Sequence, residues 1–243
     1  MSKMKRGLAG IGVPVAAALA LGVFASSALA TQATAEANWT ISGATFVNGQ
    51  PTDCEASGTL ALATTIGTTA IKITATKVEC FFAALRNFGT TALDSGKLIL
   101  SNLKVDGGGE LCTASGPIET NSLTSTLVTT TETAAVPSGL GDTFVPTQIE
   151  EEGKKVTPVF VRVELNPGCG ALAGTYPVRG SVVGESSKLG VLAVKQPLKF
   201  SSTVNKGFTE DALTFGGKAA VLTGSVNNFL TGTNAGKEWG AIK

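Results

Sequence analysis

Residues 158–165 read Pro-Val-Phe-Val-Arg-Val-Glu-Leu and show the clearest structural pattern in the chain. Apolar side chains recur at every second position, namely Val159, Val161, Val163 and Leu165. A period of two places these four on one face of a β-strand and the intervening Phe160, Arg162 and Glu164 on the other. The segment therefore predicts a strand.

Similar stretches follow one another along most of the sequence. Further candidate strands lie at 59–62, 71–80, 97–100, 176–182 and 195–200. Residues typical of turns separate them at 48–49, 94–96, 106–109, 166–168 and 216–217. Helical patterns are limited to two short segments, 81–87 and 209–213. Many short strands between turns predict an all-β chain that forms an antiparallel β-sandwich or, as the alternative, an irregular β-barrel.

The segment 129–155 differs from its surroundings because it is polar and lacks alternation. It contains a run of threonines, a Val-Pro-Ser-Gly stretch and three consecutive glutamates followed by Gly-Lys-Lys. Such composition predicts a long surface loop or loose hairpin inserted into a single β-rich domain that spans 31–243. A solvated insertion is favoured over a binding loop, since runs of charge usually mark a solvated face.

The N-terminus has the pattern of a secretory signal peptide over residues 1–30. Three basic residues within the first six precede an apolar run at 7–25, and Ala28 and Ala30 then occupy an A-x-A cleavage site. A second such site at 33–35 and an uncleaved membrane anchor are the alternatives. Cleavage near Ala30 predicts a secreted or extracytoplasmic protein, whose mature part has no apolar stretch long enough to span a membrane.

All four cysteines, Cys54, Cys80, Cys112 and Cys169, lie in the mature part. An even number of cysteines in an exported protein predicts disulfides. The start of one antiparallel strand lies beside the end of the next, which favours the pairs Cys54–Cys80 and Cys112–Cys169. Two of them, Cys54 and Cys112, begin similar five-residue motifs, Cys-Glu-Ala-Ser-Gly and Cys-Thr-Ala-Ser-Gly. This similarity indicates either a duplicated strand pair or a chance repetition of small residues.

Composition excludes several classes of function. The 243 residues include no histidine, which removes Ser-His-Asp and Cys-His catalysis and imidazole metal sites. A formal net charge of +1 with only 15% charged residues disfavours nucleic-acid binding. No pair of carboxylates stands out as a glycosidase site, and Asp106–Glu110 reads as a glycine-rich turn rather than a calcium loop. We therefore assign no catalytic, cofactor or metal site, and we do not expect an enzyme.

Aromatic residues are the remaining candidates for a binding site. Trp39, Trp239 and Tyr176 could stack on a sugar, but tryptophans near the two ends of a domain more often pack in its core. Phe81 and Phe82 follow Cys80 and are also expected in the core.

The order of the cysteine-containing motifs resembles that of a family of uncharacterised exported four-cysteine β-proteins of soil actinobacterial type. The residues that carry the resemblance are Cys54, Cys80, Cys112-Thr113, Cys169 and Gly180-Ser181-Val182. It implies a secreted, disulfide-containing β-protein, and the segment 129–155 and the spacing from Val163 to Cys169 depart from the pattern. The expected function is that of a secreted or cell-surface, non-catalytic structural or interaction protein with an unknown extracellular or envelope partner. A carbohydrate- or ligand-binding module is the alternative, and a carboxylate-based glycan-active enzyme is less favoured.

Overall fold

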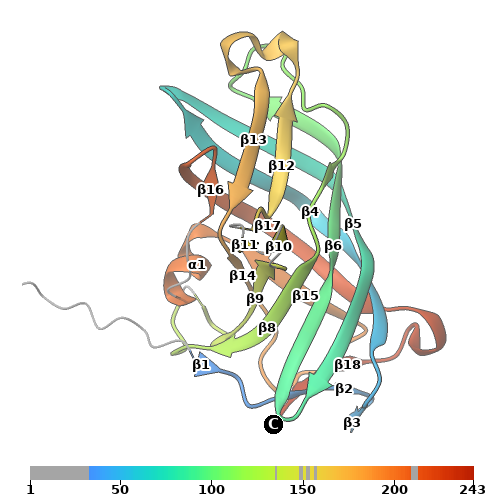
Figure 1. The fold of residues 1–243 in the computed structure, drawn as a ribbon. Helices are drawn as coiled ribbons and strands as arrows, with labels where there is room; N and C mark the ends of the chain where they lie inside the picture. Colours follow the sequence, from blue (N-terminus) through green and yellow to red (C-terminus); the bar gives the residue numbers. More distant parts are fainter. Residues whose placement is uncertain (1–32, 135, 148–149, 152–153, 156–157, 209–212) are drawn as a thin grey trace, which may run out of the picture.

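The computed structural model describes residues 33–134, 136–147, 150–151, 154–155, 158–208 and 213–243. The expected signal peptide and the expected helix start at Thr209 lie outside these residues. The dominant element is a closed antiparallel β-barrel (Figure 1), in which pairing of the last ring strand with the first closes the wall. In ring order the strands are β4 (Gln50–Ile66), β5 (Thr69–Phe88), β6 (Thr91–Asp106), β8 (Leu123–Thr129), β9 (Leu140–Pro146), β14 (Val182–Glu185), β15 (Lys195–Phe200) and β17 (Lys218–Leu230).

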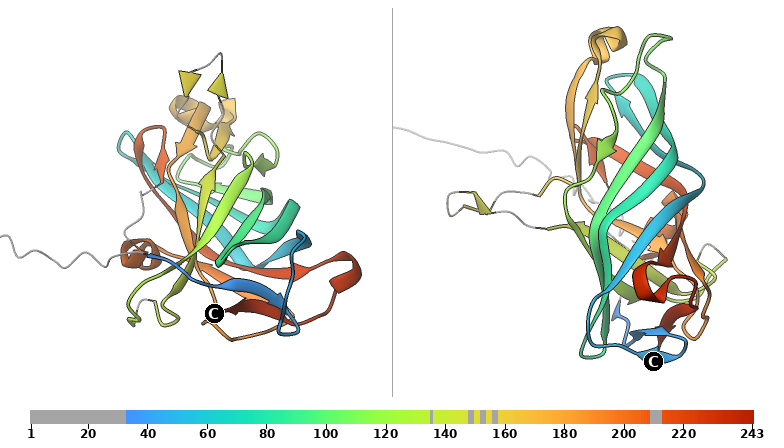
Figure 2. Two further views of the ribbon diagram at one scale, coloured as in Figure 1. Left: turned by 60° about the horizontal axis from the view of Figure 1, so that its bottom comes forward. Right: turned by 90° about the vertical axis from the view of Figure 1, so that its right-hand side faces the viewer.

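Four shorter strands extend this wall toward the upper end of Figure 1: β7 (Ile118–Glu119), β12 (Val161–Leu165), β13 (Gly174–Arg179) and β16 (Thr214–Phe215). β7 runs into β8, and β13 runs into β14. β12 lies in line with β9, and β16 lies in line with β15. Between the two strands of each of these pairs, the chain leaves the wall in a segment that we call an excursion. The excursions contain the hairpin of β10 (Glu150–Glu151) and β11 (Lys154–Lys155) and the helix α1 (Ser202–Phe208), as Figure 2 shows. The wall is therefore a simple up-and-down meander.

The all-β class is confirmed, and the architecture is the barrel that the sequence offered as the alternative to a sandwich. Long β4, β5, β6 and β17 span both halves of the wall, and the alternating stretches at 59–62, 71–80 and 97–100 lie within three of them. Residues 161–165 alternate between buried and exposed, as their pattern indicated.

Three local expectations are wrong. The polar segment 129–155 is not a surface loop throughout, because β9 lies within it and pairs with β8 and β14. Residues 94–96 and 81–87 were expected to form a turn and a helical turn, but both belong to long strands, β6 and β5. Tertiary pairing on both sides of these strands outweighs the local turn preference.

A small sheet closes the lower end of the barrel. It consists of β18 (Trp239–Ile242), β2 (Asn38–Ile41) and β3 (Ala44–Thr45), with β1 (Ala33–Thr34) pairing with β8 nearby. Trp39 and Trp239 meet edge to face with ring centroids 5.4 Å apart. Both pack against the lower ends of barrel strands at Leu85, Leu127 and Leu230. As expected, the tryptophans are core residues that tie the two ends of the domain together.

The upper interior is filled by aliphatic and aromatic side chains. Leu60, Ile73, Leu98, Phe160 and Leu222 belong to this core and line a void of about 30 Å³. On the outside, Val204 and Phe208 of α1 cover Val128, Val136 and Val183. Side chains of the described residues thus fill the barrel at this level.

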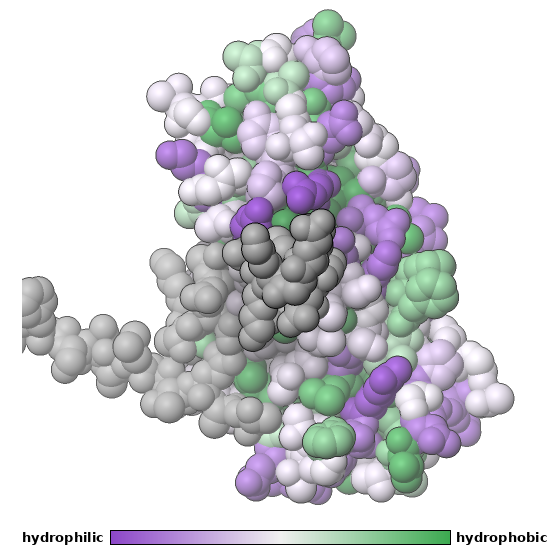
Figure 3. Space-filling model, in the orientation of Figure 1, coloured by the Kyte–Doolittle hydropathy of each residue, from purple (hydrophilic) through white to green (hydrophobic). Residues whose placement is uncertain are grey.

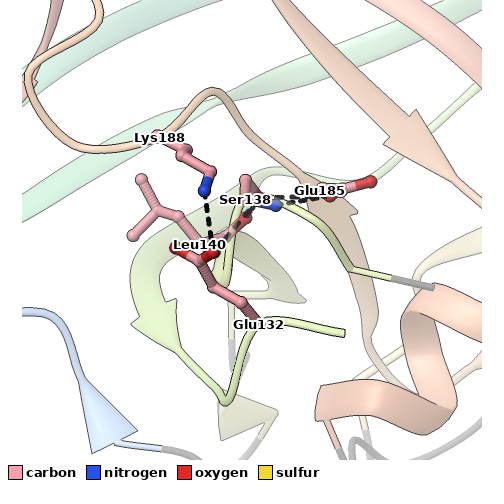
Figure 4. Close-up of polar contacts among 5 residues, drawn as sticks. All are labelled: Glu132, Ser138, Leu140, Glu185 and Lys188. Carbon is pink, nitrogen blue, oxygen red and sulfur yellow. Dashed lines mark hydrogen bonds and ion pairs between the residues drawn. The ribbon is translucent and has the colours of Figure 1, made fainter. Parts of the chain in front are cut away.

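Polar contacts fix the β8–β9 connection at the lower rim (Figure 4). The Ser138 amide and hydroxyl both donate to Glu185 Oε1, at 3.1 and 3.2 Å. Lys188 pairs with Glu132 at 2.7 Å, and Ser138 Oγ also contacts the Leu140 backbone. These contacts orient the residues that lead into β9.

The disulfides join Cys54 to Cys80 and Cys112 to Cys169, which is the pairing that the sequence favoured. The first links neighbouring strands β4 and β5. The second joins the β6–β7 connection to the 3₁₀ helix η1 (Pro167–Leu172) at the upper end. The two similar cysteine motifs therefore have different structures, since Cys54 lies inside a strand and Cys112 lies in a connection. The chain also has the 3₁₀ helix η2 (Gly232–Asn234) before β18.

The closing seam between β4 and β17 contains a bulge at Gly224, whose φ is +122°. A Cβ atom there would lie 2.2 Å from the backbone oxygen of Thr59. We expect Gly224→Ala to lower the free energy of unfolding by about 2–4 kcal/mol in urea titrations, because it adds a backbone clash to an unfavourable φ. Gly58→Ala is the matched control, since Gly58 has a similar φ of +113° but open space around it. Its loss should be about 1 kcal/mol, and equal losses at both sites would contradict the close approach of the strands.

Candidate functional site

The most unusual surface feature is a pair of exposed aromatic rings in the middle of β5. Phe81 is 46% exposed and Phe82 is 80% exposed, with ring centroids 4.0 Å apart. The expectation that they are core residues is therefore wrong. Figure 3 shows an apolar patch on the flank of the molecule over β5. We call Phe81 and Phe82 the aromatic pair.

A β-bulge holds both rings on the outside of the barrel. The register between β5 and β6 shifts between Phe81 and Ala84, so that consecutive residues Phe81 and Phe82 both face outward. Phe82 has a φ of +53°, which is rare for a bulky side chain. Gly96 on β6 makes the bulge possible, because a Cβ there would lie 2.9 Å from Ala83 Cα. The backbone is thus strained at the residue whose ring is most exposed, a combination typical of functional positions.

Ion pairs surround the aromatic pair. Lys77 pairs with Glu79 at 2.9 Å on β5 itself, and Lys97 of β6 pairs with Glu119 of β7 at 2.8 Å. Lys97 lies directly opposite Phe81 in the β5–β6 register. These two positive charges near the rings therefore each have a negative partner.

The aromatic residues that the sequence offered for sugar stacking are not available for it. Trp39 and Trp239 are buried, and each indole Nε1 donates to a backbone carbonyl, that of Leu93 or Val194. Tyr176 stacks on Phe215 at 5.0 Å and donates its hydroxyl to the Leu172 carbonyl.

Two carboxyl groups lie on the inner face of the barrel, buried at Asp142 and partly buried at Asp94, and the sequence analysis assigned neither of them a role. Burial, and secondarily the charge of Asp142, raises the pKa of Asp94 well above its usual range. Burial raises the pKa of Asp142 to about 7, against a smaller opposing effect of the nearby Ser125 hydroxyl. The cavity of about 30 Å³ beside Asp94 is much smaller than a sugar ring.

A sequence signal for Asp142 existed. Leu140, Asp142 and Phe144 alternate with smaller residues, which places the carboxyl in phase with apolar side chains. Asp94 was concealed by the turn-like Asp-Ser-Gly sequence in which it lies. Of the other carboxylates considered from sequence, Asp106 pairs with Lys104 at 2.7 Å, whereas Glu210 and Asp211 lie outside the described residues.

We also considered metal ligands, membrane-spanning helices and surface grooves among the described residues. Within the described ranges, no three or more Asp, Glu or Cys side chains gather in a way that could hold a metal ion. No helix in that part of the chain is long and apolar enough to cross a membrane. Two shallow grooves of about 450 and 460 Å³ lie at the upper end around Asp106 and Gly107, and no aromatic ring lines them. Comparison of the chain with protein-family models, curated proteins and solved structures gave no match.

The strain at Phe82 makes a specific prediction about stability. Phe82→Gly should leave the free energy of unfolding unchanged or raise it by up to about 1 kcal/mol, because glycine adopts a positive φ freely and the ring packs little. Phe81→Gly is the matched control, since Phe81 has an ordinary φ and a half-buried ring. It should lose about 1 kcal/mol or more in the same urea titration. A larger loss at Phe82 than at Phe81 would show that the Phe82 ring stabilises the fold.

Proposed function

We propose that the protein is an exported, non-catalytic interaction protein that binds a partner protein through the aromatic pair. The observation that carries the proposal is the exposure of Phe82 at a strained bulge. Exposed contiguous aromatic surface is uncommon on monomeric proteins and is typical of interaction sites. A bulge that keeps such a ring in water weakens the fold, and selection for binding explains why it would persist.

The surroundings indicate which kind of partner fits. An aromatic centre with a charged, water-exposed rim is the usual anatomy of a protein–protein interface. Because the rim charges near the rings are already paired with one another, a strongly charged partner surface gains nothing from them. The partner surface opposite Phe81 and Phe82 is therefore apolar and uncharged.

Export is the second part of the proposal. The leader pattern at 1–30 supports it, as do two disulfides, which persist in oxidising compartments. The resemblance to exported four-cysteine β-proteins agrees with this location. We accordingly place the partner in the cell envelope or the extracellular medium.

Photo-cross-linking in cultures of the producing organism tests the interaction. A benzophenone amino acid replaces Phe82 in one protein and Val145, an exposed apolar residue on β9, in the control. We expect one protein adduct from position 82 that position 145 does not give. Excess wild-type protein should suppress the adduct, and so should Phe88→Ser, because Phe88 is exposed at the lower end of β5.

The double variant Phe81→Ser/Phe82→Ser should fail to compete, with its affinity reduced by about 30-fold or more. Equal competition by this variant, or the lack of a position-specific adduct, would overturn the proposal. A glycan array run with the wild type and the double variant covers the alternative. Sugar binding that the double variant loses would replace the protein partner with a carbohydrate.

A further inference from the structure

Three polar residues lie on the inner face of three consecutive strands of the wall. Asp94 on β6 lies directly opposite Ser125 on β8, and β9 follows with Asp142 opposite Leu127. Asp142 is thus a diagonal neighbour of Ser125 on the inner face, within reach of a side-chain contact. Ser125 and Asp142 are both only 2% exposed.

Asp94 and Asp142 form no ion pair with the described residues, and Lys97, which lines the cavity beside Asp94, is paired with Glu119. On the strands that pack against them, β8 has no ionisable side chain, and the charged groups of the others are engaged or exposed elsewhere. Arg86 is exposed, Lys97 pairs with Glu119, and Glu185 accepts from Ser138. Across the barrel, Asp53 accepts the backbone N–H groups of Cys54 and Cys80, and Lys195 pairs with Glu55. Two full negative charges here would be uncompensated, which is very unfavourable in an apolar interior.

The hydrogen-bond geometry is also incomplete. Ser125 Oγ and Asp142 Oδ1 are buried without a hydrogen-bond partner in the described part of the chain. A cavity of about 30 Å³ adjoins Ser125, and Asp94, Gly96, Lys97 and Phe144 also line it. This volume admits a water molecule, and the site offers the polar partners that a buried water requires.

We propose that Asp94 and Asp142 hold one proton between them, with Ser125 and a water in the cavity completing the hydrogen bonds, and that this proton is a structural ligand of the barrel. One carboxyl group remains a neutral acid and donates its O–H, while the other accepts as a carboxylate. Loss of the proton to solvent leaves both groups as carboxylates inside the wall. The pKa values of both groups, raised chiefly by burial, agree with this arrangement.

The sign of the pH dependence follows from proton linkage. An unfolded aspartate releases its proton near pH 4, whereas the folded pair keeps a proton to about pH 7. The folded state therefore binds more protons between these values, and stability falls as the pH rises through this window. This direction is opposite to that of a salt-bridged carboxylate, which loses stability as the pH falls.

Thermal unfolding of the disulfide-bonded protein at about pH 5 and about pH 8 tests the proposal. We expect the wild-type Tm to be lower at pH 8 by about 5–10 °C. Asp142→Asn should remove most of this difference, because an amide remains neutral at both values. Asp94→Asn is a second variant in case the first folds poorly. Asp106→Asn, at an exposed ion pair, is the matched control and should keep the wild-type difference.

A carbon-13 NMR titration of the aspartate carboxyl carbons gives a second readout. Loss of the shared proton should move the carboxyl signals of both Asp94 and Asp142 at a pH well above the usual range of an aspartate, and the Asp94 signal should change in Asp142→Asn. A wild-type Tm that does not fall with pH, or an unchanged pH difference in both Asn variants, would overturn the proposal. A rise in the Tm at pH 8 on addition of calcium chloride that EDTA abolishes would also overturn the proposal, because a metal ion would then be the ligand of the pair.

Discussion

The pairing of β17 with β4 is the constraint on which the rest of the structure depends. Ten residue pairs join these strands, from Leu230–Thr52 at the lower end to Ala220–Thr64 at the upper end. β4 is the first strand of the ring along the chain and β17 is the last, so their contact converts a linear meander into a ring. A closed ring leaves no long free strand edge, and every wall residue is assigned to an inner or an outer face. The excursions at β10–β11 and α1 are accommodated because the long strands β4, β5, β6 and β17 keep the wall continuous past them.

Closure also relates the two unusual features of the molecule to one another. The bulge that exposes Phe81 and Phe82 needs a glycine at position 96, and the missing side chain of Gly96 contributes to the cavity beside Asp94 and Ser125. The strained outer surface and the buried carboxyl pair are therefore opposite sides of one irregular region of the wall. Much of the remaining inner face is apolar, although Gln196 and Asn228 are also buried on it.

Much of the fold could be predicted from the sequence because period-two alternation reports directly on a wall with one buried face. Residues 161–165 and 195–200 are strands as expected, and the order of the cysteines favoured the disulfides that the structure has. Asp94 and Phe82 could not be placed, because their roles depend on strands paired from both sides. Asp-Ser-Gly reads locally as a turn, and a phenylalanine beside a cysteine reads locally as core. Only the pairing of the strands shows that Asp94 faces the barrel interior and that Phe82 is exposed.

Native-state hydrogen exchange of the backbone amides tests barrel closure most directly. If the seam holds the wall together, the paired amides of β4 and β17 exchange only through global unfolding and are as slow as those of the β5–β6 hairpin. Exchange in the seam that is much faster than in β5 and β6 would contradict the account. It would mean that the barrel opens along β4 and β17 while the rest of the sheet stays folded.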